Sequence, residues 1–311
     1  MPQMNCTNFF HSSELFKIME NTSLHKPYMI IAEDNSGHVI GHILAIMRRK
    51  GSLIPPYFFT QGQVYGEGEY ADGVDAQELF GKMLHKITEI FTRRLCLYIE
   101  FSNIHEKMFG YKHFRKNDFF PITWQEIHNS LHSMAPEKRL TGKLKKYISR
   151  AYNHGIETRE IKDDTELNAF YSILRHQYRG KINKFLPPEK QIRDIAKSEN
   201  GKVFITIYKD KIIGGSACVY SEGNAFLWYI ATKRKTFALL HPNTATTWHA
   251  ISYAYKHNYA HIFFLDAGLP FMKNRHRDFI LSFGGKPVTK YRWFHITMPL
   301  INRLLYRFFR D

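Results

Sequence analysis

The sequence is poor in cysteine, in long apolar runs and in acidic residues. Its 311 residues include three cysteines, Cys6, Cys96 and Cys218. An odd number of cysteines at wide spacing excludes a disulfide scaffold and indicates thiols in a reducing compartment. Cys96 and Cys218 lie in apolar runs, where we expect buried, unreactive side chains rather than reactive thiols.

No stretch reaches the roughly 18 consecutive apolar residues that a membrane-spanning helix needs. Residues 1–10 also lack a basic segment followed by an apolar one, which is the pattern of a secretory signal. We therefore expect a cytoplasmic protein. Disorder is excluded as well, because 25 Phe and 18 Tyr residues supply much apolar area for a core.

Acidic residues are the clearest deficit. Asp and Glu number 28 against 44 Lys and Arg, which gives a formal net charge of +16 and a sequence pI near 9.6. This excess indicates a polyanion, an anionic membrane surface or an acidic substrate as partner, or a surface that is merely soluble and basic. The length is about twice that of a typical domain of ~150 residues, which predicts two domains.

The spacing of apolar residues predicts the same order of elements twice. In the first half we expect a helix at 11–19 capped by Ser12 or Ser13, strands at 28–32, 38–47 and 57–65, a helix at 76–91, a strand at 95–101 and further strand-like residues at 111–124. In the second half we expect helices at 166–178 and 187–196, strands at 203–208, 212–220 and 224–231, a helix at 243–257, and strands at 262–266 and 291–296.

Two predicted hairpins align the halves, because residues 38–41 match residues 211–214. Each hairpin is followed by one strand, one long helix and another strand. This matched order predicts a duplicated α/β unit, an antiparallel hairpin followed by a crossover that makes the last two strands parallel. We expect domains at 1–130 and 137–296, joined near Pro136, and a basic amphipathic helix at 297–311.

Particular residues of the second half match a known family in type and order. They are the basic helix from Lys143 to Ala151, the hairpin Ile213-Gly214-Gly215, the turn Asp266-Ala267-Gly268, and Phe279 with Phe283-Gly284. The order of elements resembles the GNAT acyltransferase fold. Two copies in tandem resemble the Fem-type, FemAB-like peptidoglycan aminoacyltransferase superfamily.

The resemblance implies an α/β (α+β) protein with two tandem GNAT-like domains, each with a mixed, mostly antiparallel sheet flanked by helices. It also implies an N-acyltransferase that moves an acyl or aminoacyl group to an amine of a cell-envelope or other phosphorylated precursor. The implied donor is acyl-CoA or aminoacyl-tRNA, and no metal is expected. The alternative is a non-catalytic RNA- or anionic-membrane-binding protein that keeps the fold, which the charge of +16 would also explain.

One position departs from the family. The residue after the first Phe of Phe-x-x-x-Phe-Gly is commonly a Lys associated with the transfer step, and here it is Ile280. An apolar side chain cannot stabilise an oxyanion. The sequence therefore leaves the choice between the two donors open.

One segment of the first half resembles the Gln/Arg-x-x-Gly-x-Gly/Ala motif with which acyl-CoA-dependent GNAT enzymes hold a pyrophosphate. Gln63, Gly66 and Gly68 fit this motif after a predicted strand. Glycines let backbone amides approach a phosphate. Glu67 and Glu69 would repel a diphosphate, so a turn that closes the strand is the competing interpretation. The equivalent second-half segment, 234–243, contains no glycine.

A stripe of cations lies on the helix that enters the second half. Arg139, Lys143, Lys146 and Arg150 are spaced by four, three and four residues. The stripe suits a phosphate-bearing substrate or an RNA backbone, and equally a solvated helix face. The other predicted substrate- or anion-binding residues are Trp228, Tyr229, Asn243 and Lys286, of which the two aromatic residues also fit a core or pocket wall.

Asp266 and His241 are the predicted catalytic residues. Asp266 ends a predicted strand beside Gly268, where α/β sheets place ligands. A carboxylate there can orient or deprotonate an amine, or it can cap a loop. His241 precedes Pro242 at a predicted helix start, and its ordinary pKa suits a general base. The sequence shows no nucleophile elbow, and acyl transfer to an amine needs only positioning and oxyanion stabilisation.

The C-terminal residues form an amphipathic pattern. One side holds Leu300, Ile301, Leu304, Leu305, Phe308 and Phe309, and the other holds Arg303, Arg307 and Arg310. Such a helix lies in a membrane interface or packs on the body of its own protein. The first alternative predicts a peripheral protein at the inner membrane face, with an anionic membrane as partner and a lipid-linked acceptor. The charge also makes tRNA a predicted partner.

Overall fold

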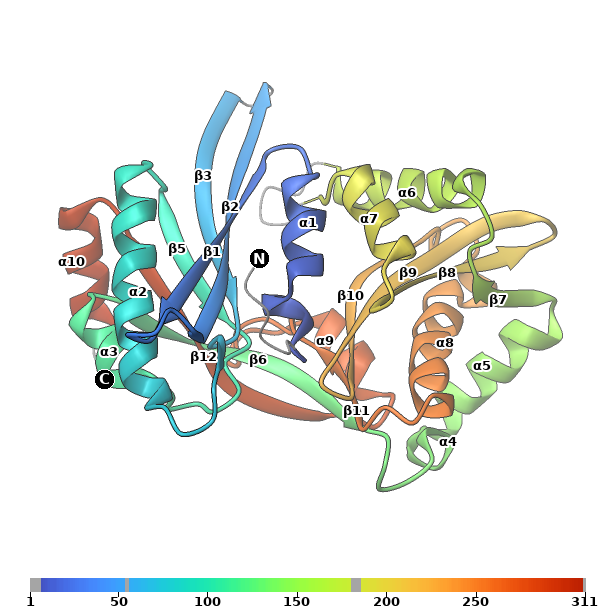
Figure 1. The fold of residues 1–311 in the computed structure, drawn as a ribbon. Coiled ribbons are helices and arrows are strands. Elements are labelled where there is room, and N and C mark those ends of the chain that lie inside the picture. The colour runs from blue at the N-terminus through green and yellow to red at the C-terminus, as the bar shows by residue number, and fades with distance from the viewer. Residues whose placement is uncertain (1–6, 54–55, 180–185, 310–311) are drawn as a thin grey trace. The chain divides into compact units, whose positions relative to one another are not determined.

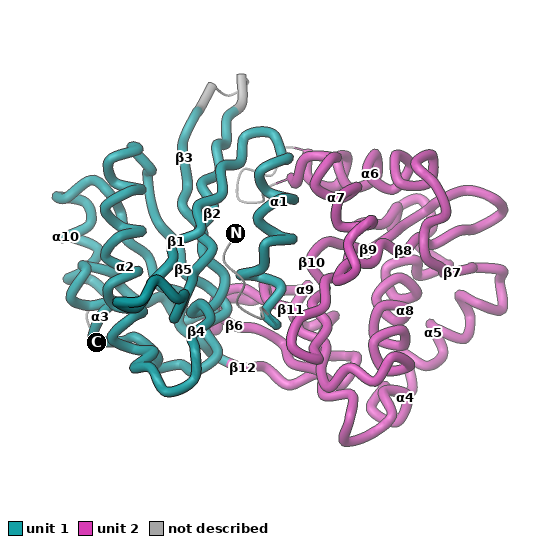
Figure 2. Tube along the Cα trace, in the orientation of Figure 1, with its two compact units in different colours: residues 1–124, 289–311 teal, residues 125–288 magenta. Residues whose placement is uncertain are grey.

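The computed structural model describes residues 7–53, 56–179 and 186–309 (Figure 1). Cys6 and Arg310 lie outside the described residues. The chain divides into two compact units (Figure 2): unit 1 consists of residues 1–124 and 289–311, and unit 2 of residues 125–288. Among the described residues, no helix combines the length and the apolar character needed to cross a membrane.

Unit 1 contains the first predicted repeat. Its β1, β2 and β3 pair antiparallel in chain order, and β3 pairs parallel with β5. The expected crossover through a long helix is therefore confirmed. Ser12 caps the first helix, because its Oγ accepts a hydrogen bond from the Leu15 N–H at 3.0 Å. The elements are α1 (Ser13–Glu20), β1 (His25–Glu33), β2 (Val39–Leu53), β3 (Pro56–Tyr65), β4 (Glu69–Tyr70), α2 (Ala76–Arg93), β5 (Tyr98–Ser102), α3 (Tyr111–Lys116) and α10 (Pro299–Phe308).

Unit 2 contains the second repeat. Here β8, β9 and β10 pair antiparallel in chain order, and β10 pairs parallel with β11. An additional strand, β7, pairs with β8 at the edge. The elements are α4 (Pro136–Arg139), α5 (Gly142–Asn153), β7 (Ile156–Glu160), α6 (Asp164–Tyr178), α7 (Glu189–Lys197), β8 (Gly201–Tyr208), β9 (Lys211–Ser221), β10 (Asn224–Thr232), α8 (Pro242–Lys256), β11 (His261–Phe264) and α9 (Arg275–Leu281).

Two strands pass from one unit to the other. The first, β6 (Phe120–Ser130), follows the first repeat but pairs with β11 of unit 2. The second, β12 (Lys286–Ile296), follows the second repeat but pairs with β5 of unit 1. This exchange places residues 289–311 in unit 1, whereas the predicted ranges assign 137–296 to the second domain.

Each unit buries the apolar side of its crossover helix against its sheet. In unit 1, Phe80, Leu84 and Ile87 of α2 lie in one cluster with Ile99 and Phe101 of β5. Burial of each such side chain stabilises the fold by about 1.5–3 kcal/mol.

In unit 2 the predicted Gly-Gly of the hairpin has a packing role. A Cβ at Gly214 would lie 2.7 Å from Thr232 Cγ2, and one at Gly215 would lie 2.5 Å from Phe170 Cδ2.

Some local expectations are wrong. Residues 111–116 form α3 rather than a strand, and the strand there starts only at Phe120. The strand expected at 262–266 ends at Phe264, so Asp266 follows it in a loop. The short elements β7 and α9 were not expected. In α3, the ring of Phe114 stacks on Trp293 with centroids 4.6 Å apart, a contact between residues far apart in sequence.

Candidate functional site

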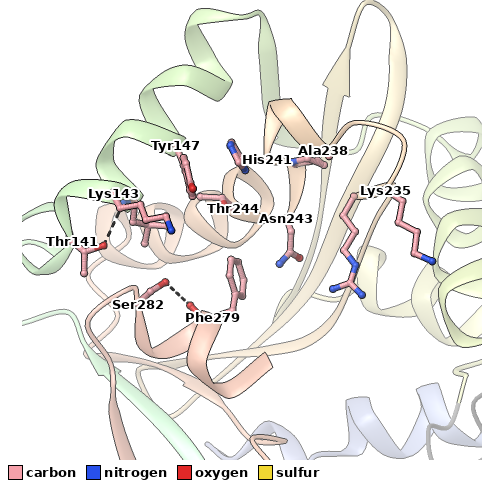
Figure 3. Close-up of a pocket in the computed structure, with 13 residues that line it drawn as sticks. Thr141, Lys143, Tyr147, Lys235, Ala238, His241, Asn243, Thr244, Phe279 and Ser282 are labelled. Atoms are coloured by element: carbon pink, nitrogen blue, oxygen red, sulfur yellow. Dashed lines mark hydrogen bonds between the residues drawn. The ribbon is translucent and has the colours of Figure 1, made fainter. Parts of the chain in front are cut away.

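A pocket of about 620 Å³ lies in unit 2 where α8 begins. Residues from α5, from the segment between β10 and α8, and from α9 form its wall (Figure 3). The side chains that matter for chemistry are Lys143, Tyr147, Arg234, Lys235, His241, Asn243 and Phe279. The pocket therefore gathers three predicted residues, Lys143, His241 and Asn243, with four that were not predicted.

The start of α8 is held by polar contacts. His241 has φ +49°, which turns the chain, and Pro242 occupies the first helical position. Thr246 donates its hydroxyl to the Pro242 carbonyl at 2.8 Å, and its oxygen lies 2.6 Å from the Thr206 hydroxyl of β8. No side chain caps α8, so its first turn contributes positive partial charge to the pocket.

The charge of the pocket is of one sign. Lys143, Arg234 and Lys235 line it, and none of the lining residues in the described part of the chain is acidic. Cations beside a helix N-terminus form a site for an anion, because the helix dipole and the side chains attract the same charge. The pocket is therefore suited to a phosphate-bearing ligand.

Aromatic side chains form the other part of the wall. Tyr147 and His241 stack with ring centroids 3.9 Å apart, and the Lys143 ammonium lies 5.7 Å from the Tyr147 ring. Burial, and then the charge of Arg150, lower the pKa of His241. His241 is thus a neutral ring at neutral pH. Phe279 of α9 lines the pocket too, so flat groups can stack beside the cations.

The parallel strands of unit 2 separate soon after they begin. Pairing of β10 with β11 covers only Ala225 and Phe226 of β10. A bulge at Trp228 then interrupts the pairing of β10 with β9. Beyond it the Gln177 side chain contacts β10, where its Nε2 donates to the Ile230 carbonyl at 3.0 Å and its Oε1 accepts from the Thr232 N–H at 3.2 Å. Gln177 therefore takes up backbone hydrogen bonds of β10 beyond the point where its pairing with β11 ends.

Asp266 follows β11 on an exposed loop. The turn after it is fixed, because Asn274 donates to the Ala267 carbonyl at 3.0 Å and the Gln125 N–H donates to the Gly268 carbonyl at 2.8 Å. Burial, and then the nearby charge of Asp266, raise the pKa of Tyr178 to about 12. Asp266 thus lies within electrostatic range of α6 and is not among the residues that line the pocket.

The remaining predicted residues are more dispersed. Lys146 and Arg150 are exposed on α5, and Lys286 is exposed at the start of β12. Trp228 and Tyr229 stack on β10 with ring centroids 5.6 Å apart. Tyr229 is buried, and its hydroxyl accepts a hydrogen bond from Gln191 Nε2 at 3.2 Å. It therefore contributes to the core, in agreement with the structural alternative.

The glycine motif of unit 1 is arranged as a turn. Gly66 donates its N–H to the Ser102 carbonyl at 2.7 Å, and Gly68 donates its N–H to His11 Nε2 at 3.0 Å. Gln63 is buried within unit 1. Because these N–H groups already donate within the protein, they are not available to hold a pyrophosphate. The arrangement favours the turn over the phosphate cradle.

The sequence did contain a signal for the residues that were missed. Lys233-Arg234-Lys235 is a run of cations directly after β10, in the segment that leads to Pro242 at the start of α8. A phosphate site at this position was expected to need glycines, whereas these cationic side chains could bind the same phosphate. Tyr147 lies within the basic helix expected from Lys143 to Ala151, and Phe279 is the first Phe of the Phe-x-x-x-Phe-Gly stretch.

Two further expectations concern buried side chains. Cys96 and Cys218 are buried, and burial raises the pKa of each thiol to about 12, so neither is a reactive thiolate. Ile280 is 1% exposed and belongs to the core cluster of unit 2, so it does not line the pocket. Among the described residues, no group of three or more His, Cys, Asp or Glu side chains is arranged to hold a metal ion.

A hairpin, a parallel pair of strands and a crossover helix that starts at a pocket lined by cations are the elements of a GNAT-like fold. A family model described as "Acetyltransferase (GNAT) domain" matches residues 112–272. This match covers more than half of the 311 residues, and the chain belongs to this family. No curated protein matches the sequence.

Solved structures share the fold of this chain. The crystal structure of FemX is 11% identical, with a TM-score of 0.66 over 97% of this chain and 96% of that chain. L-PGS from Bacillus licheniformis is 12% identical, with a TM-score of 0.61 over 99% and 100%. A tandem GNAT protein from the clavulanic acid biosynthesis pathway is 8% identical, with a TM-score of 0.57 over 89% and 84%. At these identities the likeness shows the fold, and it confirms the predicted fold class.

Proposed function

We propose that the protein is an N-acyltransferase that moves an acyl or aminoacyl group from a phosphate-bearing donor to an amine. The observation that carries this proposal is the pocket at the start of α8. Lys143, Arg234 and Lys235 would hold donor phosphate, and an adenine ring would stack on Tyr147 or Phe279. Aminoacyl-tRNA carries its acyl group on the ribose of a terminal adenosine, and acyl-CoA carries it at the end of a pantetheine arm that is joined to adenosine through phosphates.

The backbone before α8 favours aminoacyl-tRNA as the donor. The N–H groups of Phe237, Leu240 and His241 donate to carbonyls of the same segment. They are thus unavailable for the backbone cradle expected of an acyl-CoA site, and the cations of the pocket are side chains, which commonly contact nucleic-acid phosphates. The exposed stripe of Lys146 and Arg150 on α5 extends this charge. Acyl-CoA is the alternative donor.

The chemistry would take place where β10 and β11 diverge. There the amine nitrogen forms a bond to the acyl carbon, and the ester or thioester bond of the donor breaks. Asp266 would accept the proton that the amine loses, and the leaving oxygen or sulfur would take up a proton. The reacting carbonyl would lie at the β10 backbone beside Trp228, where the strand pairing is interrupted. His241, neutral in the pocket, would position the donor.

For the acceptor we propose an amine on a cell-envelope precursor or a lipid, at the inner face of the membrane. The family resemblance and the fold shared with a putative lysylphosphatidylglycerol synthetase from Agrobacterium fabrum support this class. That domain is 11% identical, with a TM-score of 0.61 over 96% of this chain and 90% of that chain. A cytoplasmic location, peripheral to the membrane, is part of the same proposal.

Thermal unfolding with each donor class tests the pocket. We expect total tRNA to raise the melting temperature more than coenzyme A does at the same micromolar concentration, because the donor that binds more tightly stabilises the folded protein more. Arg234→Gln with Lys235→Gln should abolish the shift, whereas Lys209→Gln with Lys211→Gln, two exposed cations at the β8–β9 turn, should leave it unchanged. No shift with either donor would contradict the proposal.

Asp266→Asn separates catalysis from binding. Release of deacylated tRNA or free CoA in the presence of amines should fall about 100-fold or more, the range for a lost general base. Donor-induced stabilisation should persist. Donor binding without transfer in the wild-type protein would support the non-catalytic alternative, and full activity of Asp266→Asn would remove Asp266 from the mechanism.

A further inference from the structure

The C-terminal helix α10 is attached to unit 1 by a polar side chain. Asn302 is buried, and its Nδ2 donates to the Asp118 carbonyl at 2.9 Å while its Oδ1 accepts from the Ile296 N–H at 2.8 Å. On the same side of the helix, the Arg115 guanidinium lies 3.9 Å from the Tyr306 ring, and Phe309 stacks on Phe120. The attachment of α10 therefore uses one face and fixes the direction of the other.

The opposite face of α10 is apolar and exposed. Leu300, Leu304 and Phe308 are spaced by four residues and are 80%, 69% and 78% exposed. Ile301 lies beside them and is exposed as well. Isolated exposed apolar side chains are ordinary on protein surfaces, but a continuous helical row indicates an interaction site. Arg303 and Arg307, both exposed, border this row.

A basic pocket of unit 1, about 550 Å³ in volume, lies beside the start of β5. Its cations are Lys26, Arg49, Arg93 and Arg94, and none of its lining residues in the described part of the chain is acidic. The Arg94 guanidinium and the Lys26 ammonium lie 5.6 Å and 5.7 Å from the same Tyr28 ring. Arg93 also pairs with Glu89 at 2.7 Å. The other three cations are therefore the best placed to hold an anion.

The pocket and the helix are parts of one surface of unit 1. Leu95, a lining residue of the pocket, is 84% exposed. Two residues further, the Leu97 carbonyl accepts from the Thr297 N–H at 3.1 Å, directly before α10. Met298, which follows Thr297, is also exposed and extends this surface to Leu300 of α10. We call the set of Lys26, Arg49, Arg94, Leu95, Met298 and the exposed residues of α10 the unit 1 docking surface.

We propose that the unit 1 docking surface binds an anionic phospholipid bilayer. The apolar row of α10 and Leu95 would lie at the boundary of headgroups and acyl chains, and the basic pocket would hold lipid phosphates. The charges decide between a bilayer and a second copy of this chain. Two copies, each with a formal charge of +16, repel each other across a surface bordered by arginines, whereas an anionic bilayer complements it.

This inference goes beyond donor binding, because it concerns unit 1 and the donor pocket lies in unit 2. It names the surface behind the peripheral location proposed above and rests on that part of the proposed function, whereas its failure and the failure of the donor site are separate results. If tRNA stabilises the protein but the protein does not bind vesicles, the result supports the donor site and contradicts the docking surface. If the protein binds vesicles but tRNA does not stabilise it, the result supports the docking surface and contradicts the donor site.

Flotation of the full-length protein with vesicles tests the docking surface. We expect binding to vesicles of phosphatidylglycerol with phosphatidylcholine and at least about tenfold weaker binding to phosphatidylcholine alone. Leu304→Ser with Phe308→Ser should weaken binding to the anionic vesicles by about tenfold or more. Arg49→Gln with Arg94→Gln should reduce both the affinity and its dependence on salt.

Matched variants outside the surface serve as controls. Leu239→Ser with Phe271→Ser removes two exposed apolar side chains of unit 2, and Lys209→Gln with Lys211→Gln removes two exposed cations there. Neither pair should change vesicle binding. Equal binding by the α10 variant, or by the arginine variant, would overturn the proposal. So would a wild-type protein that forms a dimer through α10, seen by sedimentation, and ignores the vesicles. Thermal unfolding of each variant verifies that it is folded.

Discussion

The same connection occurs once in each unit, and the two copies differ in charge. In unit 1 it leads from β3 to α2 and contains Gly66, Glu67, Gly68 and Glu69. In unit 2 it leads from β10 to α8, lacks glycine, and begins with Lys233-Arg234-Lys235. The backbone N–H groups of the first connection donate within unit 1, while the second connection forms part of the wall of the pocket at the start of α8, where we propose that donor phosphate binds.

The starts of the two crossover helices explain the difference. Asp75 caps α2, and its Oδ1 accepts from the N–H groups of Gln77 and Glu78 at 3.1 and 3.0 Å. A carboxylate already occupies the place that an anionic ligand would take. α8 has no such cap, and cations surround its start. A duplicated fold thus supplies two equivalent positions, and the local charge decides which of them can bind an anion.

Reversing the charge of the unit 2 connection should have the largest effect. We expect Arg234→Glu with Lys235→Glu to weaken donor binding by about 100-fold or more, because two charge-assisted phosphate contacts of about 1.5–3 kcal/mol each are lost. Isothermal titration with the donor measures the change. Glu67→Lys in the unit 1 connection serves as the control and should not alter donor affinity. A comparable loss there would mean that unit 1 contributes to the donor site.

Gly68 tests whether the unit 1 connection is built for packing. It has φ +99°, and a Cβ there would lie 2.4 Å from Ile43 Cγ1 and 2.8 Å from the His42 carbonyl oxygen. We expect Gly68→Ala to destabilise the protein by about 2–3 kcal/mol. Gly73→Ala is the matched control, with φ +80° and open space, and should cost about 1 kcal/mol. Urea unfolding compares them, and equal losses would contradict a packing role for Gly68.

His11 makes the unit 1 connection sensitive to acid. Its Nε2 accepts from the Gly68 N–H, and burial lowers the pKa of His11 from 6.5 to about 3. Below pH 6.5 the unfolded chain binds a proton that the folded chain does not, so stability is full above pH 6.5 and declines toward pH 3. One such proton gives a slope of at most about 1.4 kcal/mol per pH unit. His11→Gln should flatten the dependence in urea titrations, and parallel curves would argue against this origin.

Tyr147 should show the smallest effect. Its ring stacks on His241 in the unit 2 pocket, and Leu keeps the apolar volume without the flat face. We expect Tyr147→Leu to weaken donor binding by about fivefold, equivalent to about 1 kcal/mol. Tyr208→Leu, on an aromatic pair of the same unit that does not line the pocket, is the control for titration with the donor. No change in affinity for Tyr147→Leu would exclude stacking as part of donor recognition.

Much of the fold could be predicted from the sequence, because many elements are specified by the spacing of nearby apolar residues and by turn residues. Ala76–Arg93 carries a regular apolar stripe, and the hairpins end in recognisable turns, so these elements were expected nearly as they are. Segments stabilised by distant partners were not. In the helix Tyr111–Lys116, Phe114 stacks on Trp293, and no local sequence pattern identifies such a distant partner. The prediction of a strand there was therefore wrong.

The residues of the candidate site also divide into some that local sequence signals predicted and some that they did not. Lys143, His241 and Asn243 were expected because each lies in a segment with a clear helical start or a basic stripe, and the structure brings all three to one pocket. Arg234 and Lys235 lie in a loop whose direction no periodicity fixes. Their place in the pocket can be recognised only from the structure, in which α8 and α5 form the other walls of the same pocket. The assignment of catalytic roles to Asp266 and His241 stays a prediction.

By itself the sequence determined a basic chain with a repeated α/β order and a C-terminal row of apolar residues, because composition and periodicity are properties of the chain. The tertiary structure decided where the shortage of acidic residues has its effect. It placed cations around the start of α8 rather than α2, and it anchored α10 through Asn302 so that Leu300, Leu304 and Phe308 face outward. Charge density and exposure depend on which distant segments meet, and a linear pattern does not contain that information.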